Sequence, residues 1–324
     1  MLKDKIRNLT VLLPTYNSGE YLQYSIRSIL KQTFRKFELL IIDDGSNDDT
    51  EKVINGFSDS RIRYVKKEHE GLATTLNYGL SIAKYDWVAR MDADDICHPE
   101  RLAKQISVVN KGENFISCTW AAFFRDNKIL FTVETPINSE ELKRRLALHC
   151  YINHPSVLYN KNFILSNGGY NSKLKVYEDY ELWLRILNDV FFDVIPECLL
   201  FVRYVPDSLS KQKFSRHKEE ILYTQNKYYP LTNKLKYIDD QERIGLLSWR
   251  EWFYGDKNKA RKYWIQNPSL LLKLKVTSAF LLSFLPVKYL VLIQKLNIKY
   301  RINYILKGRK LNRSLESFII TKSA

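Results

Sequence analysis

The first hundred residues alternate between short apolar runs and amphipathic segments, and this alternation allows few folds. Apolar runs predict strands at 9–15, 37–43, 61–66 and 86–91. Helical spacing or helix-capping residues predict helices between them, at 19–32, 46–57 and 71–83. Because strands that alternate with helices form parallel sheets, we predict an α/β fold, Rossmann-like, with a mostly parallel sheet flanked by helices on both faces.

Polar clusters follow three of these predicted strands. They are "PTYN" at 14–17, "DDGSND" at 43–48 and "DADD" at 92–95. In open α/β sheets, ligands bind outside the carboxyl ends of the strands. The positions of the clusters therefore predict a ligand site at that edge of the sheet.

The "DADD" cluster places Asp92, Asp94 and Asp95 within four positions. Like charges repel at this spacing, so stability alone would not select them. Hard divalent cations take oxygen ligands, and Mg²⁺ typically uses one or two carboxylates together with substrate phosphates. The cluster thus suits a metal–diphosphate complex. The alternative is a solvated acidic turn before a helix in which Pro99 would be the first residue.

Three further groups have both a functional and a purely structural interpretation. Asp43 and Asp44 suit hydrogen bonds to a nucleobase edge or a ribose, or else form a turn and a helix cap. Tyr16 offers a stacking face, or else only packs. Glu178 and Asp179, at the start of the predicted helix 179–187, suit a general base or else complement the helix dipole.

The net charge of +15 is concentrated near the C-terminus. Residues 257 to 313 hold 14 Lys and Arg, and no acidic residue lies between Asp256 and Glu316. A nucleic-acid-binding face on the main domain therefore loses its support. The four cysteines form no CxxC pair, which argues against a zinc site or a disulfide framework and for buried, reduced thiols in a cytosolic protein. The N-terminal apolar run is too short for a signal peptide.

One apolar stretch lies inside this basic segment. Val276–Ile293 carries a single charge, Lys288, and is interrupted by Pro286. A membrane-spanning helix needs about 20 apolar residues. We therefore expect a helical, basic, membrane-associating C-terminal region, with apolar side chains in the lipid and lysines reaching the head groups. A spanning or re-entrant segment, plain packing and an oligomer contact are the alternatives.

Six motifs together resemble family 2 glycosyltransferases with the GT-A fold, and look especially similar to bacterial capsule and surface-polysaccharide transferases. Over residues 8–205 they are "LLPTYN", "LLIIDDGSNDDT", "GLATTLNYGL", "RMDADDICHPERL", "HPSVLY" and "GGYN…YEDYELWLRIL". The resemblance implies an inverting, Mn²⁺- or Mg²⁺-dependent transfer of a sugar from a nucleotide sugar, UDP-linked, to a hydroxyl of a glycan or lipid-linked acceptor. Together with the basic C-terminal region, this activity predicts a cytoplasmic protein, peripheral on the inner, anionic face of the cell membrane.

The resemblance also implies roles for single residues. The implied nucleotide-sugar-binding residues are Pro14, Tyr16, Asp43, Asp44, Asp92 and Asp94. Among them, Tyr16 and Asp44 would contact the nucleobase, with Asp43 nearby, Asp92 would approach the ribose, and Asp94 would coordinate the metal. Asp179 would be the catalytic base, with Glu178 and His154 on the acceptor side, although His154 also suits a purely structural hydrogen bond. Many members carry Arg where Leu76 stands, so any phosphate contact from that Arg is absent here.

These inferences divide the chain into four parts. They are a nucleotide-sugar-binding half (1–105), an acceptor and catalytic half (106–215), a helical extension (216–256) and the membrane-associating region (257–324). One rival function is sugar nucleotidyl transfer, which needs a Gly-rich, basic phosphate loop that "PTYNSGE" lacks. The other is a non-catalytic nucleotide-sugar-binding or membrane scaffold protein, against which the intact Asp94 and Asp179 argue. The sequence predicts no nucleic-acid partner and leaves the oligomeric state open.

Overall fold

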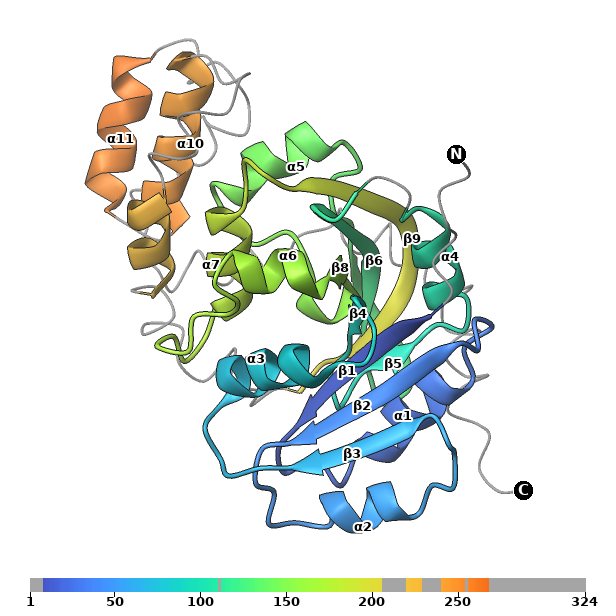
Figure 1. Ribbon diagram of the computed structural model, residues 1–324. Coiled ribbons are helices and arrows are strands. Elements are labelled where there is room, and N and C mark those ends of the chain that lie inside the picture. The colour runs from blue at the N-terminus through green and yellow to red at the C-terminus, as the bar shows by residue number, and fades with distance from the viewer. Residues whose placement is uncertain (1–7, 110–111, 206–219, 229–239, 254–255, 268–324) are drawn as a thin grey trace.

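The computed structural model describes residues 8–109, 112–205, 220–228, 240–253 and 256–267 (Figure 1). Within them lies a nine-stranded sheet with the order β3-β2-β1-β4-β8-β6-β9-β5, and β7 pairs with β6 outside this path. The strands are β1 (Leu9–Thr15), β2 (Phe37–Asp43), β3 (Ile62–Lys66), β4 (Trp87–Arg90), β5 (Ile96–Cys97), β6 (Phe115–Arg125), β7 (Lys128–Val133), β8 (Leu158–Asn160) and β9 (Phe191–Arg203).

The first four strands form the parallel half of the sheet. β1 pairs in parallel with both β2 and β4, and β2 pairs in parallel with β3. Beyond β4 the sheet becomes mixed, because β8 runs antiparallel to β4 and β6, whereas β6 and β9 are parallel. The predicted α/β class is confirmed, and the first four strands lie within one residue of their predicted bounds.

Helices cover both faces of this sheet, because alternate residues of a buried strand point to opposite sides. Val11 and Leu39 belong to one core and Leu12 and Leu40 to the other. The first core packs against α1 (Leu22–Leu30), α2 (Thr50–Asn55) and α4 (Arg101–Ser107). The second packs against α3 (Leu72–Ile82), α5 (Ser139–Leu146), α6 (Lys161–Ser166) and α7 (Glu178–Arg185), as Figure 1 shows.

The helix after the acidic cluster begins later than expected from the alternative in which the cluster is a turn before a helix that starts at Pro99. α4 starts at Arg101, and Pro99 lies in the preceding turn, where its carbonyl accepts a hydrogen bond from the Thr33 amide at 2.8 Å. Pro99 is therefore not the first helical residue. This observation weakens the alternative interpretation, in which the cluster is only an acidic turn before a helix that begins at Pro99.

Two helices near the C-terminal end of the described chain form a small pair. α10 (Asp240–Phe253) and α11 (Lys257–Gln266) pack through Trp249, Trp252 and the buried Trp264, and lie beyond α7 in Figure 1. This contact crosses the predicted boundary near residue 256, and the boundary at 105–106 falls inside α4. The four-part division itself remains a proposal.

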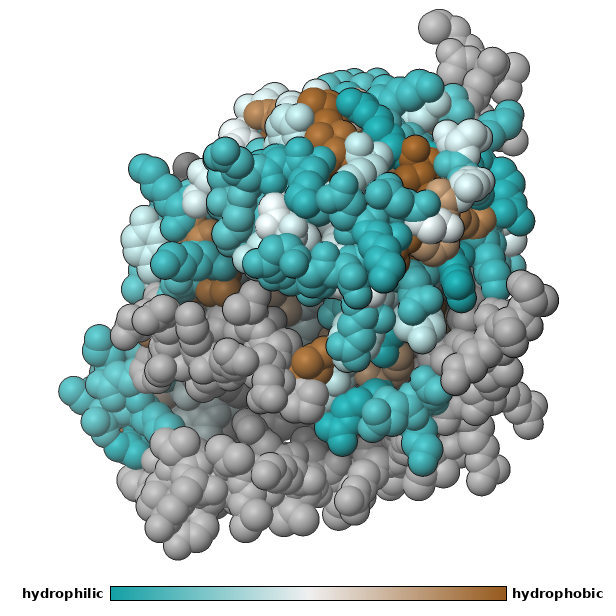
Figure 2. All heavy atoms as spheres, turned by 90° about the horizontal axis from the view of Figure 1, so that it is seen from below, coloured by the Kyte–Doolittle hydropathy of each residue, from teal (hydrophilic) through white to brown (hydrophobic). Residues whose placement is uncertain are grey.

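The membrane prediction concerns a different stretch of chain. Val276–Ile293 lies outside the residues that the structure describes. Among the helices that are described, none combines the length and the apolar character needed to cross a bilayer. On the face shown in Figure 2, the described residues are mostly hydrophilic, and the hydrophobic ones lie in small separate groups.

Candidate active site

The three polar clusters converge because β2, β1 and β4 are parallel neighbours and end at the same edge. Tyr16 directly follows β1, Asp43 is the last residue of β2, and Asp92 lies two residues after β4. Pro14 is the buried second-last residue of strand β1 and pairs with Ile42 of β2. The sequence-based expectation that these clusters share one edge agrees with this arrangement.

Side-chain hydrogen bonds join the loops after β1 and β2. The Asn17 amide donates to Ser46 Oγ, the Asn47 amide donates to Asn17 Oδ1, and the Ser18 amide donates to Thr50 Oγ1, each at 2.9 Å. Asn17 has a left-handed backbone with φ of 48°, a conformation that asparagine tolerates better than most residues. The two loops therefore form one fixed rim of the site.

Asp43 and Asp44 are both buried and bonded within the protein. Asp43 accepts hydrogen bonds from the Tyr64 hydroxyl and the Ser46 amide, both at 2.8 Å. Asp44 accepts from Lys67 Nζ at 2.7 Å and from two backbone amides. Burial raises the pKa of Asp44, but these donors outweigh it and leave the pKa below its usual value. Asp44 is therefore an ionised acceptor at neutral pH.

The carboxylates of Asp92, Asp94 and Asp95 offer ligand oxygens that all lie within 4.8 Å of one another. Two elements hold their loop. Ser25 Oγ of α1 donates to the Asp92 carbonyl at 2.8 Å. From the end of β9, the Arg203 amide donates to Asp95 Oδ1 at 2.9 Å, and Arg203 Nε donates to the Asp94 carbonyl at 3.0 Å.

The electrostatics of this cluster favour a cation. Burial and the neighbouring Asp92 raise the pKa of Asp94 to about 6, and burial with Asp94 raises that of Asp95 well above its usual value. Asp95 Oδ2 is buried and has no hydrogen-bond partner among the described residues. Mg²⁺ and Mn²⁺ prefer carboxylate oxygens as ligands, and here several lie close together, one of them without a hydrogen-bond partner. The residues present therefore fit such an ion.

Arg90, the last residue of β4, links this cluster to the opposite side of the site. It is 2% exposed, and its Nη1 lies 2.5 Å from Asp92 Oδ2. Burial acts to lower the pKa of Arg90, but Asp92, and more weakly Glu178, raise it, so the guanidinium stays charged. One buried cation thus interacts electrostatically with both the acidic cluster and the carboxylates of α7.

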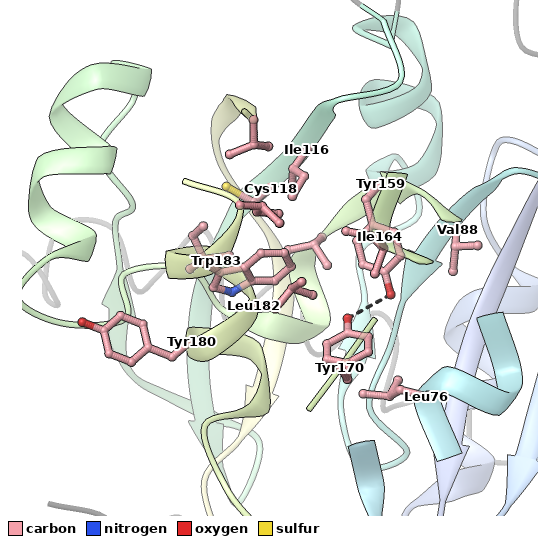
Figure 3. Packing of buried hydrophobic residues seen from close by; sticks show 14 of the residues in the cluster. Leu76, Val88, Ile116, Cys118, Tyr159, Ile164, Tyr170, Tyr180, Leu182 and Trp183 are labelled. Atoms are coloured by element: carbon pink, nitrogen blue, oxygen red, sulfur yellow. Dashed lines mark hydrogen bonds between the residues drawn. The ribbon is translucent and has the colours of Figure 1, made fainter. Parts of the chain in front are cut away.

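His154 lies beside those carboxylates in the short 3-10 helix η1 (His154–Ser156). Its Nδ1 is 3.6 Å from Glu178 Oε1, and its Nε2 is 2.8 Å from the Tyr170 hydroxyl, which bonds to Tyr159 (Figure 3). Burial, together with Arg90, lowers the pKa of His154 to about 3. A neutral imidazole in this network orients its neighbours, which supports the structural interpretation of His154.

Glu178 and Asp179 are the first two residues of α7. The N-cap is Tyr177, which has a left-handed backbone and makes no side-chain cap bond. Asp179 Oδ1 accepts a hydrogen bond from the Tyr180 amide at 2.7 Å, and its Oδ2 lies 3.9 Å from Cys150 Sγ. Burial, and then the neighbouring Glu178, raise the pKa of Asp179 above its usual value. A carboxylate with a raised pKa beside a second acid has the character of a general base.

Leu76 contributes to the core and not to the site. It is fully buried among Leu12, Tyr170 and their neighbours, and Figure 3 shows it pointing toward the Tyr170 ring. A guanidinium would not fit this apolar position without a partner. The apolar packing around this position therefore suits Leu76, although many members of the family carry Arg here.

Four residues that contact the site were not identified from the sequence: Arg90, Arg203, Lys67 and His69. Arg90 had a signal, since it is the one charged residue inside the apolar run "WVARM". Arg203 had none, because it lies 108 residues from the Asp95 that it holds. Lys67 and His69 follow β3 in a polar loop whose neighbours only the fold defines.

A clamp joins the two halves of the site and gives a first testable prediction. Asn77 of α3 bonds to both the amide and the carbonyl of Tyr170, and Gly169 has φ of 62°. A Cβ at Gly169 would lie 2.5 Å from Asn77 Oδ1. We expect Gly169→Ala to lower the free energy of unfolding by about 1–3 kcal/mol, from backbone strain and the lost clamp. Urea denaturation measures it.

The same substitution in an Asn77→Ala background supplies the control. Without the Asn77 side chain, only the backbone strain remains, so Gly169→Ala should cost less there. Equal costs in the two backgrounds would show that the clamp contributes nothing to stability.

The sheet with its edge of aspartates, and the helix of acids facing it, define a protein of the GT-A class. The model of "Glycosyl transferase family 2" matches residues 10–167. An uncharacterized glycosyltransferase of Methanocaldococcus jannaschii is 32% identical over 260 residues, which cover 76% of this chain and 86% of that protein. The chain belongs to glycosyltransferase family 2.

Other relatives agree with this assignment. The O-antigen biosynthesis glycosyltransferase WbnJ of Escherichia coli is 31% identical over 221 residues, covering 65% of this chain and 85% of WbnJ. An uncharacterized glycosyltransferase of Rickettsia felis is 30% identical over 234 residues, but the match spans only 38% of that longer protein. Among solved structures, S. aureus TarS 1-349 in complex with UDP-GlcNAc superimposes with a TM-score of 0.60 at 17% identity, covering 85% of this chain and 79% of that one. This likeness confirms the GT-A fold.

Proposed function

We propose that the protein is an inverting, metal-dependent glycosyltransferase that transfers a sugar from a UDP-linked donor to a hydroxyl of a glycan or lipid-linked acceptor during surface polysaccharide synthesis. One observation carries the proposal: the buried Arg90 contacts Asp92 of the carboxylate cluster at the strand ends and also interacts electrostatically with Glu178 and Asp179 of α7. The site thus has a donor side and an acceptor side.

Each side suits one part of the reaction. In this proposal Tyr16, Asp43 and Asp44 hold the nucleobase, Pro14 shapes the rim beneath it, and Asp92 approaches the ribose. Asp94 would hold a Mn²⁺ or Mg²⁺ ion, and such an ion would supply positive charge beside the leaving diphosphate. Asp179 takes the proton from the acceptor hydroxyl, and attack from the side opposite the diphosphate inverts the anomeric centre. Glu178 and His154 lie on the acceptor side, where they orient Asp179.

The named relatives support the donor and the pathway. WbnJ is described as an O-antigen biosynthesis enzyme, and TarS was solved with UDP-GlcNAc and with UDP. UDP is therefore the nucleotide to test first, and surface glycans are the first acceptors. The sugar, the linkage and the oligomeric state stay open.

A panel of nucleotide sugars incubated with the protein and Mn²⁺ tests the proposal. Release of UDP from one donor, abolished by a chelator and accompanied by a glycosylated product of inverted anomeric configuration, is the expected result. Release of pyrophosphate from a nucleoside triphosphate and a sugar phosphate would instead identify a nucleotidyltransferase. Donor binding without turnover of any substrate would identify a non-catalytic binding protein.

We further propose that the protein is cytoplasmic and peripheral on the inner face of the cell membrane. The basic segment supports this, since residues 257–313 carry 14 Lys and Arg, of which Lys257, Lys259, Arg261 and Lys262 belong to α11. Each Lys or Arg near an anionic surface contributes about 1 kcal/mol, an effect that salt screens. A lipid-linked acceptor would explain why a catalytic domain needs such a surface.

We expect truncation after residue 267 to abolish binding to anionic vesicles. This cut keeps the packed tryptophans of α10 and α11 but removes 10 of the 14 basic residues and the apolar stretch. In flotation assays, full-length protein should bind at low salt and stay partly bound at high salt, because apolar insertion resists screening. Equal flotation of both forms would contradict the proposal. Complete release of the full-length protein at high salt would leave the charge effect and exclude insertion.

A further inference from the structure

His69, in the loop that follows β3, makes two contacts at the proposed nucleobase site. Its ring lies on the Tyr16 ring, with centroids 4.1 Å apart and planes inclined by 20°. Its Nδ1 is 2.8 Å from Asp44 Oδ2 and 3.1 Å from the Asp44 carbonyl oxygen. Because both oxygens are acceptors, Nδ1 carries the proton and donates. A flat ring with an N–H thus stacks on Tyr16 and bonds to Asp44.

Together with three other donors, His69 fills the acceptor positions of the Asp44 carboxylate. An ionised carboxylate has about four acceptor positions. Lys67 Nζ and the Glu70 amide bond to Oδ1 at 2.7 and 3.1 Å, and the Gly71 amide bonds to Oδ2 at 2.8 Å. The amides are fixed at the start of α3, and the Lys67 side chain is only 13% exposed. The His69 side chain, at 53% exposed, is the partner that is free to move away.

We propose that His69 is a further residue of the donor site, whose imidazole occupies the position of the nucleobase between Tyr16 and Asp44 until the base displaces it. This inference rests on the proposed function, in which Tyr16 and Asp44 hold the base. Uracil replaces both contacts, since its ring stacks and its N3–H donates to a carboxylate. His69 therefore lowers the affinity for the nucleotide by the free energy of the contacts that the base must break.

Calorimetric titration with UMP tests this, because UMP carries the base and ribose without a diphosphate or a need for metal. We expect His69→Ala to bind UMP about two- to tenfold more tightly than the unaltered protein, the range that a stacked ring pair contributes. Glu68→Ala is the matched control, since its exposed side chain lies next in the same loop. It should bind UMP as the unaltered protein does. Unchanged or weaker binding by His69→Ala would overturn the proposal.

Nuclear magnetic resonance of the unaltered protein gives a readout that loop stability does not affect. The ring current of Tyr16 shifts the His69 ring protons upfield, and UMP should return them to the values of a solvent-exposed histidine. Persistence of the upfield shift at saturating UMP would overturn the displacement while leaving the proposed function intact. Failure of UMP and of UDP with Mn²⁺ to bind any form would instead refute the proposed function and this inference together.

Discussion

Asp179→Asn should reduce turnover by at least about 10²-fold while leaving the affinity for UDP and Mn²⁺ nearly unchanged. The side chain keeps its size and its bond to the Tyr180 amide, but the amide can no longer accept a proton from the acceptor hydroxyl. General base catalysis contributes about 10²–10⁴ in rate. The residues proposed to bind the donor are all unchanged in this variant. Steady-state kinetics with saturating donor, and calorimetry with UDP, measure the two effects separately.

Asp189→Asn is the matched control, because Asp189 is an exposed acid just beyond the same helix. It should change neither quantity. Turnover of Asp179→Asn within a few-fold of the unaltered enzyme would show that Asp179 only complements the dipole of α7. Loss of UDP affinity by the same variant would show that the two sides of the site are not separate.

The pH dependence of turnover provides a second readout of the same residue. A base works when deprotonated, and burial raises the pKa of Asp179 above its usual value. Turnover at saturating donor and metal should therefore fall as the pH drops through this raised pKa, at a higher pH than for an exposed aspartate. The residual activity of Asp179→Asn should lack that acidic limb.

The sequence predicted those features that local patterns determine. The buried strands β1 and β2 have their predicted bounds, because a short, uninterrupted apolar run is typical of a buried strand. The parallel order of β2, β1 and β4 then brings Tyr16, Asp44 and Asp92 to one edge. Features that depend on distant contacts were not predictable in this way. Arg203 reaches the acidic loop from β9, and the register that places it there is a property of the whole sheet.

The same distinction explains the acceptor side. Sequence reasoning placed Glu178 and Asp179 at a helix start but gave capping and catalysis equal standing. The structure places both acids in the first turn of α7, beside the N-cap Tyr177, and also near Arg90 and His154, so both interpretations keep a structural basis and the kinetics of Asp179→Asn decide between them. His69 shows the limit most clearly. A histidine in a charged loop has no sequence signal, and its stacking on Tyr16 depends on how the loops after β1 and β3 meet.

Asp94→Asn should abolish the metal-dependent part of UDP binding and reduce turnover by at least about 10²-fold, because a bound cation stabilises developing charge by several kcal/mol. The same variant should be more stable to urea at neutral pH than the unaltered protein. The pKa of Asp94 is raised from 3.8 to about 6, so its ionisation opposes folding. This cost is absent below about pH 4 and complete above about pH 6.

These opposite effects distinguish a ligand from a structural residue. A variant that misfolds loses activity and stability together. A variant that removes a metal-binding carboxylate, which its neighbouring carboxylates repel, should lose activity but be more stable in the absence of metal. Asp189→Asn is again the control, since Asp189 is an exposed aspartate far along the chain from the cluster and should change neither property. If Asp94→Asn kept the Mn²⁺ dependence of UDP binding, the three carboxylates would owe their clustering to something other than a metal. If it lost stability at neutral pH, their repulsion would already be neutralised within the protein, with Arg90 and Arg203 as the nearest sources of positive charge.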